Sequence, residues 1–179
     1  SSMVSRYLLR NIARSTDERT LIGTPAPAFP AGHSLAAIGS DAGGLAIWNL
    51  GATLSSLPID WQMRRRLVGT NISYAFLIEL AVTPRAQSAG MARLALALAC
   101  PHPCVAPAWM MLRRESPLAL RQYWALTQAR RAQLLPVVDC LAAARLGLQW
   151  QDIKKMLAEC DRSKEDLADD AGGQLSPIG

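Results

Sequence analysis

The sequence predicts an α+β fold, with a small mixed sheet and helices in the first half of the chain and a helical second half. Short apolar or β-branched runs occupy the beginning of the chain, whereas apolar residues at helical spacing dominate from residue 45 onward. Half of the 179 residues are hydrophobic and 18% are charged, which indicates a globular chain. We expect residues 4–85 to form the mixed part, residues 86–162 the helical part, and residues 163–179 a polar, disordered tail.

Three short strands are predicted near the beginning of the chain. Residues 6–13 and 20–24 are apolar or β-branched runs on either side of a polar connection at 15–18. Residues 33–38 form the third strand candidate. Three prolines that follow the second run are expected to break regular structure: Pro25, Pro27 and Pro30.

Two helices are predicted in the rest of the first half. Residues 45–57 carry apolar side chains at helical spacing, and Pro58 suits the first turn of a second helix over residues 59–68. The sequence Gly69-Thr70-Asn71 should end that helix. The apolar run 72–82 ends at Thr83-Pro84, where a turn is expected to lead into a strand.

The second half is predicted to contain three helices. The first covers residues 89–99. Ser116-Pro117 is a favourable helix start, and the helical pattern continues to about Leu146, with a kink or break expected at Pro136. A last short helix is expected over residues 151–160, followed by a polar end.

Several sequence motifs of catalysis are missing. No Gly-rich loop of the dinucleotide or phosphate-binding type is found, and no Gly-rich turn follows a strand to hold S-adenosylmethionine. No two prolines are adjacent, so the Asn/Asp-Pro-Pro-aromatic loop of amino-methylating enzymes is absent. We therefore expect a chain that is not catalytic by itself and that binds no cofactor.

The sequence Cys100-Pro-His-Pro-Cys104 resembles a metal site at first sight. Zinc usually needs four ligands, and Cys140 and Cys160 are distant and fall on buried or helical patterns. A packed, proline-stiffened loop is therefore favoured over a metal site. A small enzyme that uses Cys104 or His102 is a further hypothesis, but a catalytic triad has few candidates because His33 and His102 are the only histidines.

The sequence predicts a cytoplasmic protein without a membrane segment. No stretch reaches the roughly 18 apolar residues of a membrane helix, and no signal peptide heads the chain. The four cysteines are accordingly expected to be reduced thiols.

Clustered arginines are the main indication of a binding function. The formal net charge of +5 permits a polyanionic partner. The run Arg64-Arg65-Arg66 ends a predicted helix, where cations favour the helix dipole, but arginine also suits phosphate contact. The following Thr70 and Asn71 add a hydroxyl and an amide, and Asn can pair with adenine through two hydrogen bonds. The residues alone leave both interpretations open.

Three stretches carry a resemblance to a known family. The first is Arg10-Asn-Ile-Ala-Arg-Ser-Thr-Asp-Glu-Arg-Thr-Leu-Ile, and the second runs from Ile59-Asp60-Trp61 through the arginines to Gly69-Thr70-Asn71 and an apolar strand ending at Pro84. The third lies in residues 124–157. In this order and spacing they resemble the carboxy-terminal target-recognition region of type IIG-like restriction-modification enzymes and phage-defence adenine-specific DNA methyltransferases. The chain departs from the family at Pro136, where the family helix is continuous, and at Arg145-Leu146, where Tyr is usual.

The resemblance implies a division of labour between domains. An N-terminal methyltransferase domain would bind S-adenosylmethionine and methylate a flipped adenine, and this chain would bind double-stranded DNA and read its sequence. The alternative is a protein-interaction module whose apolar helical half docks on a separate catalytic domain. The residues expected to contact DNA are Arg10, Arg14, Arg19, Thr20, Arg64, Arg65, Arg66, Thr70 and Asn71.

Overall fold

A computed structural model describes residues 5–27, 30–40, 44–82, 89–99, 106–107, 109–110 and 124–160. The strands are β1 (Ser5–Arg10), β2 (Gly23–Pro27) and β3 (Leu35–Ile38). The helices are α1 (Gly44–Leu54), α2 (Leu57–Arg66), α3 (Tyr74–Ile78), α4 (Ala89–Leu98), α6 (Gln128–Arg145) and α7 (Trp150–Cys160). The predicted α+β class is confirmed, with strands early in the chain and helices after them.

The sheet has the order β2-β1-β3, and both strand pairs are antiparallel, so the sheet is not mixed. The prediction that Pro25 and Pro27 break regular structure is wrong, whereas Pro30 lies outside the strands and helices as predicted. Pro25 and Pro27 lie inside β2, where Pro25 is paired with Tyr7 of β1. Among the described strands, β2 pairs with β1 alone, and an edge strand can accept prolines because one side of it needs no ladder hydrogen bonds.

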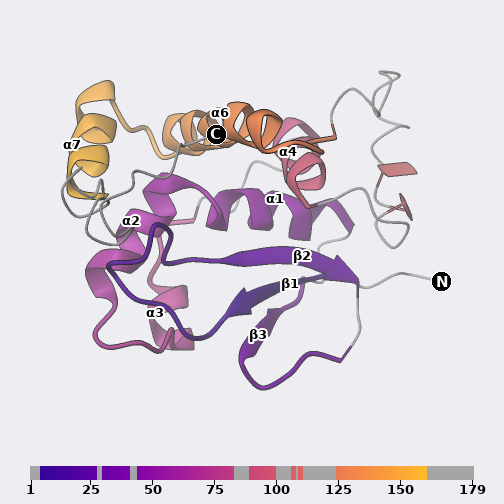
Figure 1. Ribbon diagram of the computed structural model, residues 1–179, viewed down its shortest axis with the longest axis horizontal. Coiled ribbons are helices and arrows are strands. Elements are labelled where there is room, and N and C mark those ends of the chain that lie inside the picture. Colours follow the sequence, from indigo (N-terminus) through magenta and orange to yellow (C-terminus); the bar gives the residue numbers. More distant parts are fainter. Residues whose placement is uncertain are drawn as a thin grey trace, which may run out of the picture.

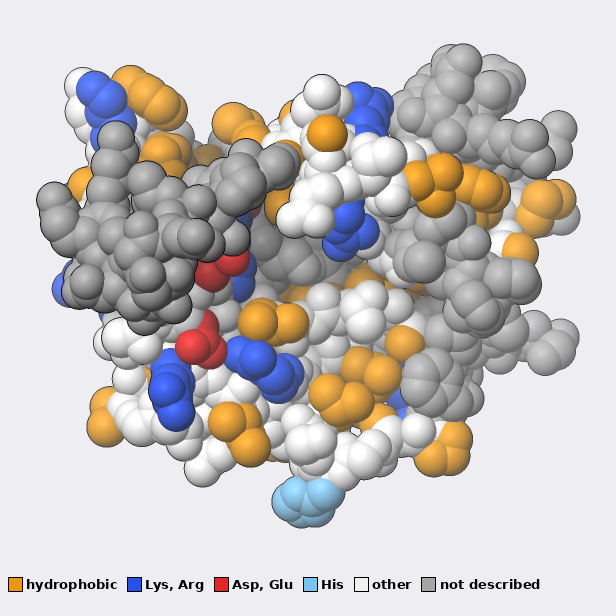
Figure 2. All heavy atoms as spheres, in the orientation of Figure 1, with side chains coloured by type: hydrophobic (Ala, Val, Ile, Leu, Met, Phe, Trp, Pro, Cys, Tyr) orange, Lys and Arg blue, Asp and Glu red, His pale blue; other side chains and the backbone are white. Residues whose placement is uncertain are grey.

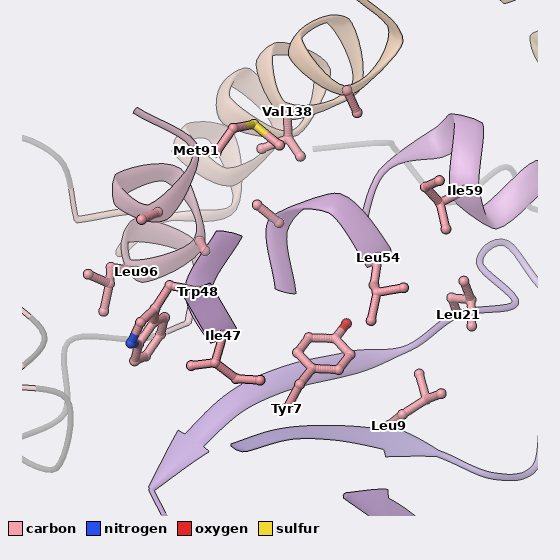
Figure 3. Packing of buried hydrophobic residues seen from close by; sticks show 14 of the residues in the cluster. Tyr7, Leu9, Leu21, Ile47, Trp48, Leu54, Ile59, Met91, Leu96 and Val138 are labelled. Atoms are coloured by element: carbon pink, nitrogen blue, oxygen red, sulfur yellow. The ribbon is translucent and has the colours of Figure 1, made fainter. Parts of the chain in front are cut away.

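The helices α1, α4 and α6 stack on one face of this sheet. Figure 1 shows α1 above the sheet and α4 and α6 in a further layer above α1. Tyr7 of β1 points toward α1, while Met91 of α4 lies close to Val138 of α6 (Figure 3). These residues belong to one hydrophobic cluster that contains side chains from both predicted parts of the chain. The mixed part and the helical part therefore share a core.

The helices α1 and α2 agree closely with their predictions. Pro58 lies in the first turn of α2, as its missing N–H allows. The first amide of α2, Leu57 N–H, donates to Asp139 Oδ1 of α6 at 2.6 Å. Gly69 has a φ of 86°, which a residue with a Cβ rarely adopts, so the chain turns away after α2 at this point.

The turn expected at Thr83-Pro84 and the strand after it lie outside the described residues, and the apolar run 72–82 before them forms no strand. Ile72 and Leu80 are buried and anchor the two ends of the segment. Between them the chain forms the short helix α3, which leaves Tyr74 and Ile78 exposed. Phe76 and Leu77 of α3 pack partly against the core, so this segment contributes its apolar side chains from a helix and not from a strand.

The helical pattern expected from residue 116 is interrupted. Residues 124–126 are not helical, and α6 begins after Thr127, whose Oγ1 accepts a hydrogen bond from Arg130 N–H at 3.2 Å. Pro136 does not break α6. Pro136 is exposed, so the carbonyl that loses its helical donor can bind water instead.

The last helix, α7, was predicted to within one residue. The predicted tail at 163–179, the sequence Cys100–Cys104 and the Ser116-Pro117 start lie outside the described residues. None of the helices within the described ranges has the length and apolar character needed to cross a membrane.

Candidate nucleic-acid interface

The two segments expected to contact DNA are joined to each other in the structure. Ala13 N–H donates to Thr70 O at 2.9 Å, and Ile72 N–H donates to Asn11 O at 2.8 Å. Ile12 and Asn71 form the isolated antiparallel bridge between these hydrogen bonds. We call residues 11–14 and 70–72 the paired strip. The strip brings together segments that lie more than fifty residues apart in the sequence.

Asp17 organises the connection between β1 and β2, which continues from the paired strip. Its Oδ2 accepts hydrogen bonds from the Arg10 guanidinium at 3.0 Å and from Arg14 N–H at 3.1 Å. Asp17 N–H donates back to Arg14 O at 3.2 Å. This local hydrogen bonding is typical of Asp in a turn.

Asp60 of α2 holds the far end of the same connection. Its carboxylate is 1% exposed, and Oδ1 accepts hydrogen bonds from Thr20 N–H at 2.8 Å and Leu21 N–H at 2.7 Å. Oδ2 pairs with the Arg64 guanidinium at 3.3 Å. A buried carboxylate needs such partners because its desolvation is costly. Asp60 is therefore a central residue of this part of the molecule.

Arg64 faces the connection between β1 and β2. Its guanidinium donates to the carbonyl oxygens of Ser15 at 2.6 Å, Asp17 at 2.8 Å and Glu18 at 3.0 Å. Its side chain is 13% exposed. A guanidinium has five N–H donors, and most of those of Arg64 are engaged inside the protein. The expectation that Arg64 contacts phosphate is corrected: in this structure it holds a loop.

Thr20 and Arg19 are also turned inward. Thr20 is fully buried, so it has no surface that DNA could touch, and the expectation of a contact there is corrected as well. Arg19 pairs with Asp139 of α6 at 3.3 Å. Burial raises the pKa of Asp139 above its ordinary value of 3.8, while Arg19 and Leu57 N–H favour its charged form.

The other two arginines of the run, Arg65 and Arg66, pair with acids in different parts of the molecule. Arg65 lies over the Trp61 ring, 5.1 Å from its centroid, and pairs with Glu159 of α7 at 3.1 Å. Arg66 donates to Gln62 O at 3.0 Å and approaches Glu79 at 3.6 Å. In Figure 2, basic and acidic side chains lie next to one another over α2 and α3. The run does not present three guanidinium groups to one phosphate.

Arg14, Thr70 and Asn71 are the expected contact residues that lie on the paired strip. All three are exposed. Within the described part of the chain, the Arg14 guanidinium forms no hydrogen bond or ion pair. Of the six arginines expected to contact DNA, the other five each have a described acidic partner. The exposed, uncommitted groups are thus concentrated on the paired strip.

Sequence reasoning attributed no role to the three aspartates that organise this region: Asp17, Asp60 and Asp139. Asp60 had a usable signal, because a single acid between Ile59 and Trp61 in an apolar helix start requires an internal partner. Asp139 had a similar signal between Val138 and Cys140.

Among the residues that the structure describes, the remaining chemistry-bearing side chains form no second site. His33 is exposed, and its carbonyl oxygen accepts a hydrogen bond from Asn11 Nδ2 at 3.1 Å. Cys140 and Cys160 are free thiols. Within the described ranges, no group of three or more His, Cys, Asp or Glu side chains could hold a metal ion.

Comparison with known proteins found no matching family model, no similar curated protein and no similar solved structure.

Proposed function

We propose that the chain is a DNA-binding target-recognition module and that the paired strip is its contact surface. The observation that carries the proposal is the joining of residues 11–14 to residues 70–72 by backbone hydrogen bonds. The sequence indicated both segments as DNA contacts, and their backbones lie side by side. Arg14 offers a planar donor fork, and Asn71 offers an amide that can both donate and accept.

The contacts are of two kinds in this proposal. Arg14 and the Thr70 hydroxyl bind phosphate oxygens, while Asn71 reads a base edge, for which an amide is suited to adenine. Arg10, Arg65 and Arg66 are paired with exposed or half-exposed acids. Exposed pairs of this kind stabilise the fold only weakly, so a phosphate can replace the acid when DNA binds.

The family resemblance supplies the context of this function. The module would position a duplex for an adenine-specific methyltransferase domain that binds S-adenosylmethionine elsewhere in the parent enzyme. Methylation of adenine requires the base to leave the stack, so the recognition module must hold the flanking duplex. The paired strip contributes binding and no catalytic group.

The test measures binding of a fluorescent duplex of mixed sequence by anisotropy between about 50 and 200 mM salt. Arg14→Glu should weaken binding at least about tenfold and lower the salt slope by about 1 or more, because a phosphate contact is lost. Arg130→Glu on α6 is the matched charge reversal and should leave affinity within about twofold. Circular dichroism verifies that both variants fold. The proposal is overturned if the unaltered chain does not bind at low salt or if Arg14→Glu binds like it.

A separate observation favours a second function, docking on another protein. Such a module would need an exposed apolar surface on the later helices, and α6 has one. The two functions are compatible because α6 and the paired strip are different elements.

A further inference from the structure

The helix α6 is apolar on its solvent side as well as on its core side. Its buried residues are Leu134, Val138, Ala142 and Ala143. Five exposed residues recur at helical spacing on the other side, and we call them the α6 face: Pro136, Val137, Cys140, Leu141 and Ala144. Val137 is 44% exposed and Leu141 is 39% exposed. A helix that is apolar all round is usually covered on all sides.

The α6 face lacks the charges that normally make a helix surface soluble. Asp139 is the only charged residue between positions 132 and 144. Its two oxygens point away from solvent, toward Leu57 N–H and the Arg19 guanidinium. The solvent side of α6 therefore has no charge across its middle.

Positive charge is concentrated at the beginning of α6. Arg130 and Arg131 lie in its first turn, which contains no acid. Among described residues, the Arg130 side chain donates to Gln133 Oε1 at 3.0 Å and that of Arg131 to Leu98 O at 2.6 Å, and neither meets a carboxylate. The positive end of the helix dipole adds to both charges, so this arrangement is unfavourable by itself. Arg145, in the last turn, suits the negative end of the dipole.

We propose that the α6 face binds an amphipathic helix of another protein whose apolar row ends in an Asp or Glu side chain placed against Arg130. Arg130 precedes Val137 by seven residues, or two helical turns, so it lies on the same side of α6. The partner helix covers the apolar row, and its carboxylate supplies the anion that the first turn of α6 lacks. This inference deepens the docking function and does not depend on DNA binding.

Charge argues against a second copy of this chain as the occupant. Two antiparallel copies of α6 would place Arg145 of one against Arg130 of the other. Two parallel copies would place Arg130 against Arg130. Like charges are juxtaposed in both arrangements, which costs binding energy, whereas an acidic partner gains it.

The experiment uses the full chain and two fluorescent synthetic helices of about 16 residues, a length that spans α6 at about 1.5 Å per residue. Both helices carry the same row of leucines. At one end of this row, one helix has Glu at the positions where the other helix has Lys. The Glu helix should bind, and the Lys helix should bind at least about tenfold more weakly. Leu141→Asp should abolish binding of the Glu helix, and it is expected to fold because Leu141 is half-exposed. Maleimide labelling of Cys140, located by mass spectrometry, should slow when the Glu helix is bound.

Charge exchange gives the decisive control. Arg130→Glu should lose its preference for the Glu helix and gain affinity for the Lys helix, whereas Arg14→Glu should bind both helices as the unaltered chain does. Equal binding of the two helices overturns the proposal. Self-association of the unaltered chain in sedimentation, removed by Leu141→Asp, also overturns it and makes a second copy the occupant. Failure of DNA binding with intact helix binding would contradict only the function proposed for the paired strip.

Discussion

Asp60 and Arg64 lie one turn apart on α2 and hold the same loop, Asp60 through backbone amides and Arg64 through backbone carbonyls. The Asp60 carboxylate accepts the amides of Thr20 and Leu21, and the Arg64 guanidinium donates to carbonyls between residues 15 and 18. The 3.3 Å pair between the two side chains keeps both in position. The connection between β1 and β2, which begins at the paired strip, is therefore shaped by α2.

Removal of the Asp60 carboxylate should strongly destabilise the protein. Asp60→Ala leaves two buried amides and one guanidinium without their acceptor, and loss of one member of a buried pair typically costs about 3–5 kcal/mol. Urea denaturation measures the free energy of unfolding. Glu18→Ala, in the exposed part of the same loop, should change it by less than about 0.5 kcal/mol. A loss for Asp60→Ala no larger than that of Glu18→Ala would show that the carboxylate is not needed.

Arg64→Lys separates a loop-holding role from a phosphate contact. Lysine keeps the charge but has no planar fork, so it cannot reach three carbonyl oxygens and Asp60 together. We expect a loss of stability of about 2 kcal/mol, because hydrogen bonds to a charged group contribute about 1.5–3 kcal/mol. Arg65→Lys on the exposed side of α2 is the matched control. Unchanged stability with weakened DNA binding in Arg64→Lys would restore the phosphate assignment.

Gly51 of α1 should not tolerate alanine, although alanine normally stabilises a helix interior by about 0.5–1 kcal/mol. A Cβ at this position would lie 2.7 Å from Pro25 Cγ and 3.1 Å from the Tyr7 ring. We expect a net destabilisation of about 1–3 kcal/mol from overpacking, measured by thermal or urea unfolding. Gly32→Ala is the control, since nothing lies within 4 Å of its added Cβ. A stabilised Gly51→Ala variant would mean that α1 can move away from β2.

Tyr7 makes stability sensitive to alkaline pH. Burial raises the pKa of its phenol from 10.0 to about 12, although the hydrogen bond with Ser55 acts in the opposite direction. The raised pKa means that the stabilising contribution of the neutral phenol is complete below pH 10 and is lost as the pH rises to about 12. The loss corresponds to about 3 kcal/mol.

The Tyr7→Phe variant tests this dependence by urea unfolding at several alkaline pH values. It should have nearly the stability of the unaltered chain at neutral pH, because the Ser55 bond is long at 3.3 Å, and it should lack most of the alkaline loss. An equally steep alkaline loss in the variant would attribute the effect to other groups.

Local patterns predicted the regular elements well where the chain is continuous and amphipathic, as in α1, α2, α4 and α7. They failed where neighbours in space decide the conformation. Pro25 is acceptable in β2 because that strand is at an edge, and residues 74–78 form α3, from which Phe76 and Leu77 pack partly against the core. A sequence window contains no information on sheet order or on which end of a segment is covered.

The sequence indicated the residues that form the paired strip, but not which of the expected arginines are already paired inside the protein. Arginine-rich and Thr-Asn segments are visible in the sequence itself. The ion pairing of each arginine is not visible in the sequence, because Arg19 meets Asp139 across 120 positions and Arg65 meets Glu159 across 94. Ion pairing depends on distances in space that folding alone creates, so folding separates Arg14, which is available to a ligand, from Arg64, which holds the protein together.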